Sequence, residues 1–150
     1  MKEDIPLLGR WVARAFQKYW RVTRGFRLSV EACVIDEAGR TLMIRDENGV
    51  SWKLPEGTVR KNENLETALR CILRDGAAIE VNGTPELVVF YSIGQSEQRG
   101  VYFVRQWRQS LAETGREMRF FPLDELPAGI NPETCARIRR LVEGRTISQV

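Results

Sequence analysis

The sequence of 150 residues contains no histidine. A Ser-His-Asp triad, a Cys-His pair and every metal site with imidazole ligands are therefore excluded. Any chemistry performed by this chain must use carboxylates, lysine, arginine, tyrosine, serine or cysteine. The absence of histidine thus excludes several large classes of hydrolase and metalloprotein.

Cysteine is scarce as well. Cys33, Cys71 and Cys135 form an odd, widely spaced set without a Cys-x-x-Cys pair. This spacing predicts neither a disulfide framework nor a structural zinc site. We expect all three to be small, buried, apolar side chains.

Long apolar runs are also absent, and none approaches the roughly 20 residues that a helix needs to cross a bilayer. The first residues, MKEDIP, are acidic and lack the basic and then apolar plan of a signal peptide. We therefore expect a cytoplasmic protein. The length and the apolar content of 43% are sufficient for a single domain with one core.

Positive charge is concentrated at the beginning of the chain. Residues 1–27 contain seven basic and two acidic side chains, a net charge of +5, whereas the whole chain carries +3. Within residues 1–24, apolar and aromatic residues recur at helical spacing and basic residues follow the opposite face, which predicts an amphipathic helix. This arm either packs on the domain or contacts a protein partner, a second copy of the chain, or an anionic surface such as lipid or nucleic acid. The pattern alone leaves these alternatives open.

The remaining chain alternates between strand and helix patterns. Val30, Ala32 and Val34 share one face of the first strand, whereas Glu31 and Cys33 share the other. Such alternation fits an α/β/α sandwich around a mixed sheet. The predicted strands are 26–35, 41–46, 50–54, 85–93, 100–107 and 118–123, the predicted helices are 64–75 and 131–144, and the predicted polar connections include 94–99 and 108–117.

The most informative stretch is residues 54–79, LPEGTVRKNENLETALRCILRDGAAI. It predicts a glycine-containing turn, a helix capped by Asn64 and a return strand. Positions 72, 75 and 76 are related as i, i+3 and i+4, so a helix projects them from one side. They hold Ile72, Asp75 and Gly76, and because glycine is a poor interior helix residue, we expect the helix to end near Asp75.

This stretch resembles the Nudix hydrolase signature, G-x5-E-x7-R-E-U-x-E-E-x-G-U, where U is a bulky apolar residue. In the family a W-x-L-P-G-G-type segment precedes the signature, and this chain has WKLPEG at 52–57. The segments KYWRVTRG, DEAGRTLMIR and RFFPLDELPAGINPETCARIRRL extend the similarity to small bacterial, MutT-like Nudix proteins over nearly the whole chain. Gly57, Glu63, Leu73 and Ile79 match the signature and Asp75 matches in charge, whereas Cys71, Ile72, Gly76 and Ala78 replace its arginine, two glutamates and second glycine.

The resemblance implies a Nudix-type α/β/α sandwich over residues 25–145, preceded by the arm at 1–24 and followed by a tail at 146–150. In the family, glutamates at these positions hold Mg²⁺ or Mn²⁺, and the cations assist cleavage of nucleoside diphosphate-linked compounds. Only Asp75 remains as a carboxylate in this chain. We therefore expect a degenerate box in which Mg²⁺ or Mn²⁺ binding is weak or absent.

Three hypotheses follow for the function. In the first, the protein binds a phosphorylated or nucleotide-like ligand with impaired hydrolysis, or acts as a regulatory module. In the second, it is a slow Mg²⁺- or Mn²⁺-dependent diphosphate hydrolase with a rebuilt metal site, and in the third it works through the arm at 1–24. The candidate residues are Asp75 and Glu63 for catalysis, Asp75 for metal, and Arg45, Trp52, Gly57, Arg60, Lys61 and Arg74 for ligand binding.

The charge of the signature segment permits two interpretations. Residues 57–79 contain four basic and three acidic side chains, whereas a metal-binding box should be strongly acidic. In one interpretation the helix has become an ordinary packing element with solvated basic residues. In the other, Arg60, Lys61, Arg70 or Arg74 replaces the metal ions as the countercharge for a phosphate group.

Overall fold

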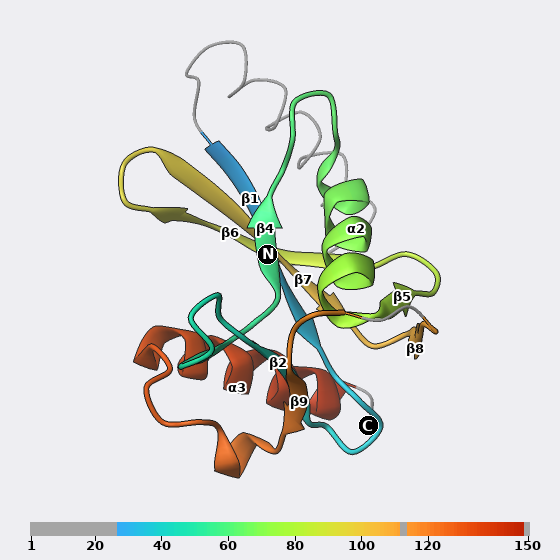
Figure 1. Ribbon diagram of the computed structural model, residues 1–150. Helices are drawn as coiled ribbons and strands as arrows, with labels where there is room; N and C mark the ends of the chain where they lie inside the picture. Colours follow the sequence, from blue (N-terminus) through green and yellow to red (C-terminus); the bar gives the residue numbers. More distant parts are fainter. Residues whose placement is uncertain (1–26, 112–113, 149–150) are drawn as a thin grey trace.

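The computed structural model describes residues 27–111 and 114–148 (Figure 1). The predicted helical arm at 1–24 lies outside these residues, so the alternatives for its role stay predictions. Within the described part, no helix is both long and apolar enough to span a membrane.

The centre of the molecule is a four-stranded mixed sheet. Its strands are β1 (Arg27–Val34), β4 (Glu56–Thr58), β6 (Glu86–Ile93) and β7 (Glu97–Val104), in the order β4-β1-β7-β6. β1 and β7 run parallel, and the other two pairs are antiparallel. The predicted mixed sheet is therefore confirmed.

Two smaller sheets flank the central one. The first joins β3 (Trp52–Lys53), β2 (Thr41–Arg45) and β9 (Met118–Phe121), and all its pairs are antiparallel. The second pairs β5 (Ile79–Val81) with β8 (Trp107–Gln109). A short 3₁₀ helix, η1 (Leu123–Glu125), follows β9.

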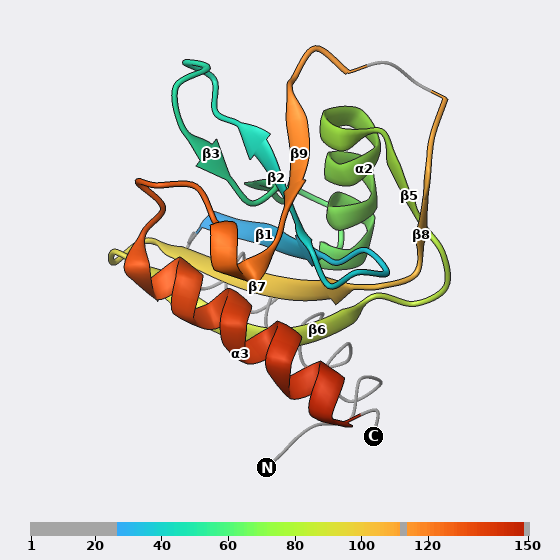
Figure 2. The ribbon, with the colours of Figure 1, turned by 90° about the horizontal axis from the view of Figure 1, so that it is seen from below.

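One helix covers each face of the central sheet (Figure 2). α2 (Leu65–Ala77) packs on the face that carries Val30, Ala32 and Val34, and α3 (Pro132–Ser148) packs on the face that carries Cys33. The alternation of β1 therefore divides the core into two apolar clusters, because successive side chains of a strand point to opposite faces. The predicted α/β/α sandwich is observed.

The ends of α2 follow from its sequence only in part. The Asn64 side chain accepts a hydrogen bond of 2.8 Å from the Thr67 N–H, which confirms the predicted N-cap. The predicted end near Asp75 is wrong, since the helix passes through Gly76 and ends at Ala77. Ala77 is fully buried, and its packing outweighs the low helix propensity of the glycine before it.

Other sequence predictions also need correction. β7 begins at Glu97, inside the segment expected to be a loop, and pairs there with β6. β8 starts at Trp107, the end of the predicted strand, and extends into the expected polar connection, where it pairs with β5. Gly144 does not end α3, which continues to Ser148. Of the three cysteines only Cys33 is buried, and burial raises the pKa of its thiol to about 12.

Candidate functional site

The residues of the Nudix-like signature line a pocket of about 330 Å³ beside α2, here called the box pocket. It is bounded by the N-terminal part of the signature on β4 and the following loop, and by the exposed side of α2. Its lining residues are Ile44, Glu56, Thr58, Arg60, Glu63, Ala68, Cys71, Ile72, Asp75, Gly76 and Arg116.

Ile72, which lines this pocket, lies against Gly57, a predicted ligand-binding residue that does not itself line it. A Cβ atom at Gly57 would lie 2.7 Å from Cδ1 and 2.9 Å from Cγ1 of Ile72. The isoleucine therefore fills the space above the glycine and joins the apolar cluster under α2. Where the family places a glutamate, this chain places a packing residue.

Asp75, the remaining carboxylate of the triplet, lies at the surface. Its side chain is 71% exposed, and its Oδ1 accepts a hydrogen bond of 3.1 Å from Nε of Arg74. Arg74 also lies 3.7 Å from the Cys71 sulfur through Nη2. The predicted ligand-binding Arg74 thus pairs with its neighbour and does not line the box pocket.

The other two carboxylates of the pocket are held by internal partners. Glu63 Oε1 accepts a hydrogen bond of 3.0 Å from the Arg60 N–H, which fixes the loop before α2. Glu56 Oε2 accepts one of 3.0 Å from Lys53 Nζ. Both carboxylates therefore serve the local structure of the loop and of β4.

The donor set of the box pocket does not fit the Mg²⁺ or Mn²⁺ site that the resemblance implies. These cations need several oxygen ligands, usually from carboxylates. Asp75 is the one carboxylate at the three signature positions, and Glu56 and Glu63 are engaged elsewhere. Over the described parts of the chain, no group of three or more Cys, Asp or Glu residues is arranged to hold a metal ion.

A second and larger pocket, of about 480 Å³, lies on the other face of the sheet and is here called the α3 pocket. Its walls come from β1, β3, β6, β7 and the beginning of α3. Glu56 lines both pockets, so the two adjoin at this side chain. The α3 pocket is lined by Glu31, Trp52, Lys53, Leu54, Glu56, Tyr91, Ser92, Ile93, Arg99, Gly129, Ile130, Asn131, Glu133, Thr134 and Arg137.

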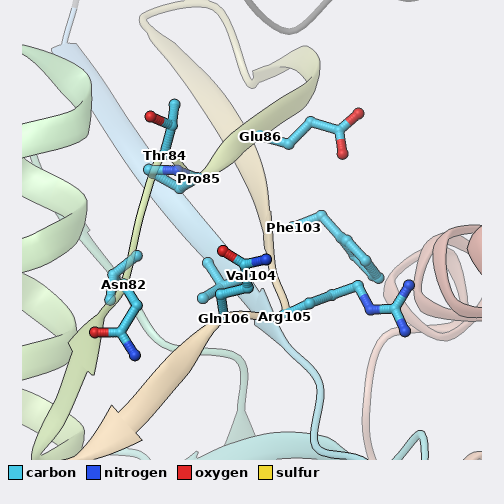
Figure 3. A pocket seen from close by; sticks show the side chains of 9 residues that line it. Asn82, Thr84, Pro85, Glu86, Phe103, Val104, Arg105 and Gln106 are labelled. Carbon is cyan, nitrogen blue, oxygen red and sulfur yellow. The ribbon is translucent and has the colours of Figure 1, made fainter.

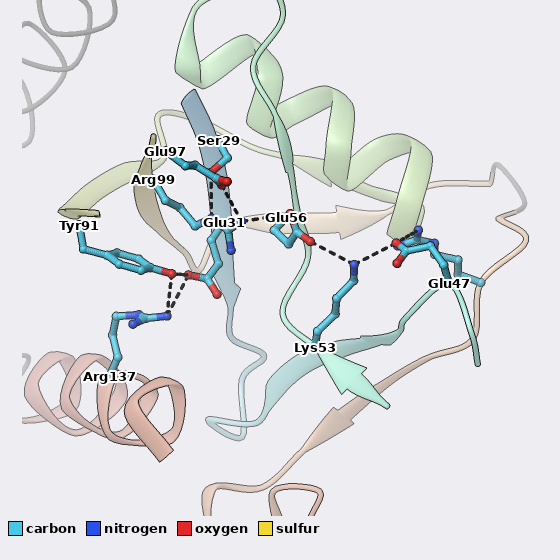
Figure 4. Close-up of polar contacts among 10 residues, drawn as sticks. Ser29, Glu31, Glu47, Lys53, Glu56, Tyr91, Glu97, Arg99 and Arg137 are labelled. Atoms are coloured by element: carbon cyan, nitrogen blue, oxygen red, sulfur yellow. Dashed lines mark hydrogen bonds and ion pairs between the residues drawn. The ribbon is translucent and has the colours of Figure 1, made fainter. Parts of the chain in front are cut away.

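Glu31 lines the α3 pocket and lies between Tyr91 and Arg137 (Figure 4). Its side chain is 6% exposed, and its Oε1 accepts hydrogen bonds of 3.0 Å from both Tyr91 Oη and Arg137 Nη2. The Arg137 guanidinium also lies 4.5 Å above the Tyr91 ring. Burial and the negative charge of Glu31 together raise the pKa of Tyr91.

A second cluster on the same face centres on Arg99. Its Nε donates to Ser29 Oγ at 2.9 Å, and its Nη2 lies 3.0 Å from Glu97 and 3.5 Å from Glu56. Burial disfavours the ionised form of Glu97, but hydrogen bonds from Ser29 and Arg99 outweigh this effect and lower its pKa. Burial also disfavours the charge of Arg99, yet the nearby Glu56 contributes to a raised pKa. Both groups therefore remain charged at neutral pH.

Lys53 links this cluster to the box side (Figure 4). Its Nζ lies 3.0 Å from both Glu56 and Glu47, and Glu47 also accepts from Arg116 Nη2 at 2.8 Å. The hydrogen bond from Lys53 is the main cause that lowers the pKa of Glu47 to about 2. Alternating charges thus run from Arg99 through Glu56, Lys53 and Glu47 to Arg116.

The remaining predicted residues are divided between the two pockets and the surface. Trp52 lines the α3 pocket, with the Arg45 guanidinium 4.2 Å above its ring. Arg45 pairs with Glu117 at 3.2 Å and lines neither pocket. Arg60 lines the box pocket, whereas the exposed Lys61 does not.

A third pocket, of about 180 Å³, lies between the 82–85 loop and the end of β7 (Figure 3). The loop is fixed by a hydrogen bond of 2.8 Å from the Asn82 N–H to the Gln106 carbonyl. None of the predicted site residues lines this pocket. It is therefore separate from the signature.

The most important site residues that the sequence did not reveal are Glu31, Arg99 and Arg137. Arg137 lies 106 residues from Glu31 along the chain, and no local pattern connects them. One signal was present, because Glu31 is a charged residue between the apolar Val30 and Ala32 in the middle of a strand. A carboxylate in such a place requires a partner of opposite charge.

Comparison with known proteins gives similarity in structure only. No family model matches the sequence, and no curated protein matches it. An ADP compounds hydrolase aligns with a TM-score of 0.66 at 15% identity, over 82% of this chain and 74% of that chain. A MutT structure from work on Aliivibrio salmonicida and Vibrio cholerae gives 0.64 at 17% identity, over 79% and 98%. The MutT NUDIX hydrolase from Burkholderia pseudomallei gives 0.60 at 24% identity, over 77% and 97%.

These three alignments place the chain in the class of α/β/α proteins with a mixed central sheet and a strand-loop-helix unit at the site. Within that class it has the Nudix fold. The architecture predicted from the resemblance is therefore confirmed.

Proposed function

We propose that this Nudix-fold protein binds a phosphorylated, nucleotide-like ligand across its two adjoining pockets and hydrolyses it poorly or not at all. The observation that carries the proposal is the contact between Ile72 and Gly57. It places a packed isoleucine where the resemblance implies a metal ligand. Metal ions contribute several kcal/mol to the stabilisation of such transition states, and each ~1.4 kcal/mol changes the rate about tenfold.

Ligand binding is supported by what the two pockets offer. On the box side, Arg60 and Arg116 supply positive charge for phosphate oxygens. On the α3 side, Trp52 and Tyr91 are half-buried aromatic side chains that suit a planar ring. The neighbours in structure include a hydrolase of ADP compounds, which is consistent with a nucleoside diphosphate derivative as the ligand.

The test is a calorimetric titration of the full chain with nucleoside diphosphate derivatives, with EDTA and with Mn²⁺, followed by product analysis. We expect binding that EDTA does not weaken, and no turnover. Ligand binding that depends strictly on Mn²⁺, together with cleaved product, would contradict the proposal.

The matched variant is Ile72→Glu/Gly76→Glu, which places acidic side chains at positions 72, 75 and 76. With Asp75 it gives three carboxylates on one side of α2. We expect this variant to bind Mn²⁺ measurably more tightly than the unmodified chain. If both bind Mn²⁺ equally tightly, the substitutions in the box are not what limits metal binding.

A slow hydrolase is the second candidate, and one observation favours it. Glu56, Glu63 and Asp75 all line the box pocket. Rearrangement of their present partners would be needed before they act together. Turnover that is lost in Asp75→Asn, while ligand affinity is kept, would select this alternative.

A further inference from the structure

Glu56 lies at the boundary between the box pocket and the α3 pocket, and its carboxylate is held by two cations. Lys53 Nζ donates to Oε2 at 3.0 Å, and Arg99 Nη2 lies 3.5 Å from Oε1. The Lys53 and Arg99 side chains are 26% and 16% exposed, so both charges are partly withdrawn from water. Glu97 and Glu47 each hold one of these cations at 3.0 Å, and the place between the cations suits an oxyanion.

The position of Glu56 in the sheet is unfavourable for a carboxylate. Glu56 is the direct cross-strand partner of Glu31 in the β1–β4 pair. Like charges directly opposite each other on neighbouring strands are destabilising. The pair is tolerated because Arg137 neutralises Glu31 on one side and Lys53 and Arg99 neutralise Glu56 on the other.

Glu56 also has a second place to which its carboxylate can turn. It lines the box pocket together with Arg60 and Arg116. No hydrogen bond or ion pair of the Arg60 guanidinium is found within the described residues, and the side chain is exposed. A displaced Glu56 carboxylate would therefore meet positive charge on the box side as well.

We propose that Lys53 and Arg99 form a binding site for a phosphate group, and that the Glu56 carboxylate occupies it as an internal substitute in this structure. The phosphate enters by displacing Glu56 toward the box pocket. Glu56 thereby reduces the affinity for phosphate-bearing ligands and favours those with enough charge to compete. This inference rests on the proposed function and specifies a place for one phosphate of the ligand in addition to the one offered by Arg60 and Arg116.

The experiment compares the full chain with its Glu56→Gln and Glu47→Gln variants by calorimetric titration with inorganic pyrophosphate, in EDTA and at constant ionic strength. Glutamine keeps the size of Glu56 and removes its charge. We expect Glu56→Gln to bind pyrophosphate about fivefold to tenfold more tightly, on the scale of one charge-assisted hydrogen bond.

Glu47→Gln is the matched control. Glu47 contacts the same Lys53 ammonium at 3.0 Å, but its side chain is 66% exposed and it lines neither pocket. We expect its affinity for pyrophosphate to change by less than about twofold, because exposed ion pairs are weak. An equal gain in both variants would mean that pyrophosphate responds to net charge alone, and would overturn the proposal.

Thermal unfolding verifies that Glu56→Gln is folded. The proposal is also overturned if this folded variant binds pyrophosphate no more tightly than the unmodified chain. The same holds if neither protein binds pyrophosphate. Its failure is distinct from failure of the proposed function. If the unmodified chain binds nucleotide but Glu56→Gln shows no gain in pyrophosphate affinity, only this inference is contradicted. If Glu56→Gln gains pyrophosphate affinity but the unmodified chain does not bind nucleotide, only the proposed function is contradicted.

Discussion

Glu56 and Gly57 are neighbours in β4, yet their environments on the two faces of the central sheet differ sharply. Gly57 faces α2, where the Ile72 side chain leaves no space for a Cβ atom at this position. Glu56 pairs with Glu31 on the face covered by α3, in a network of arginine, lysine, tyrosine and serine. On the α2 face the space at Gly57 is filled by the apolar Ile72 side chain, whereas the α3 face holds buried charges that neutralise one another. Removal of a charged side chain should therefore lower the free energy of unfolding strongly on the α3 face and only weakly on the box face.

The largest expected effect comes from removing the buried carboxylate of the α3 face. Glu31→Ala leaves the Arg137 guanidinium buried without its partner, which should lower the free energy of unfolding by about 3–5 kcal/mol. Urea denaturation measures this change. Asp75→Asn is the control on the box face, and because Asp75 is 71% exposed its removal should cost no more than about 1 kcal/mol. Equal losses of unfolding free energy in the two variants would show that the two faces do not differ in their dependence on charge.

A steric test applies to the box face. Gly57→Ala places a methyl group 2.7 Å from Ile72 Cδ1 and should lower the free energy of unfolding by about 1–3 kcal/mol. Ile72→Val removes that Cδ1 and should reduce the penalty when the two changes are combined. A double-mutant cycle by urea denaturation measures the coupling. Additive effects would show that Gly57 and Ile72 do not constrain each other.

A smaller, stabilising effect is expected at the end of α2. Ala78 occupies the position of the second signature glycine and has φ 53°, the left-handed region that favours glycine. Ala78→Gly should therefore raise the free energy of unfolding by about 0.5–1 kcal/mol. The control is Ala77→Gly, one residue earlier and helical, which should lower it by about 1 kcal/mol or more. Thermal unfolding of both variants measures whether glycine is more stable than alanine at position 78 but not at position 77.

The smallest effect concerns the pH dependence of the α3 face. The folded-state pKa of Glu97 is lowered below its ordinary value of 4.5, so its contribution to stability is present above that pH. This contribution is lost as the pH falls below 4.5 and through the lowered pKa. The unfolding free energy of Glu97→Gln should consequently fall less steeply on acidification in this range. Identical pH profiles of the variant and the unmodified chain would contradict the assignment.

The frame of the signature could be predicted because it depends on neighbours in sequence. The Asn64 cap, the strand alternation of residues 30–34 and the start of α3 each follow from a pattern a few residues long. The extension of α2 to Ala77 could not be predicted in the same way. The propensity of Gly76 is local, but the burial of Ala77 is decided by the core.

The candidate site shows the same division. Residues of the signature, such as Arg60, Glu63 and Asp75, were found from sequence and do line one pocket. Arg99 contacts the nearby Glu97, but its contact with Glu56 and that of Arg137 with Glu31 join residues 43 and 106 positions apart, so the sequence did not reveal either site role. Their roles depend on strand register and on where α3 crosses the sheet. Neither of these is encoded in a short pattern.

The sequence by itself determined that the triplet at 72, 75 and 76 has one carboxylate, because residue identity and helical spacing are sufficient for that conclusion. Its resemblance to the Nudix signature, carried by Gly57, Glu63, Leu73 and Ile79, also predicted the fold. Only the tertiary structure decided that Ile72 covers Gly57, that Glu56 joins two pockets, and that the buried charge lies on the opposite face. Such contacts join segments far apart in the chain, and their geometry is set by the packing of the sheet between its two helices.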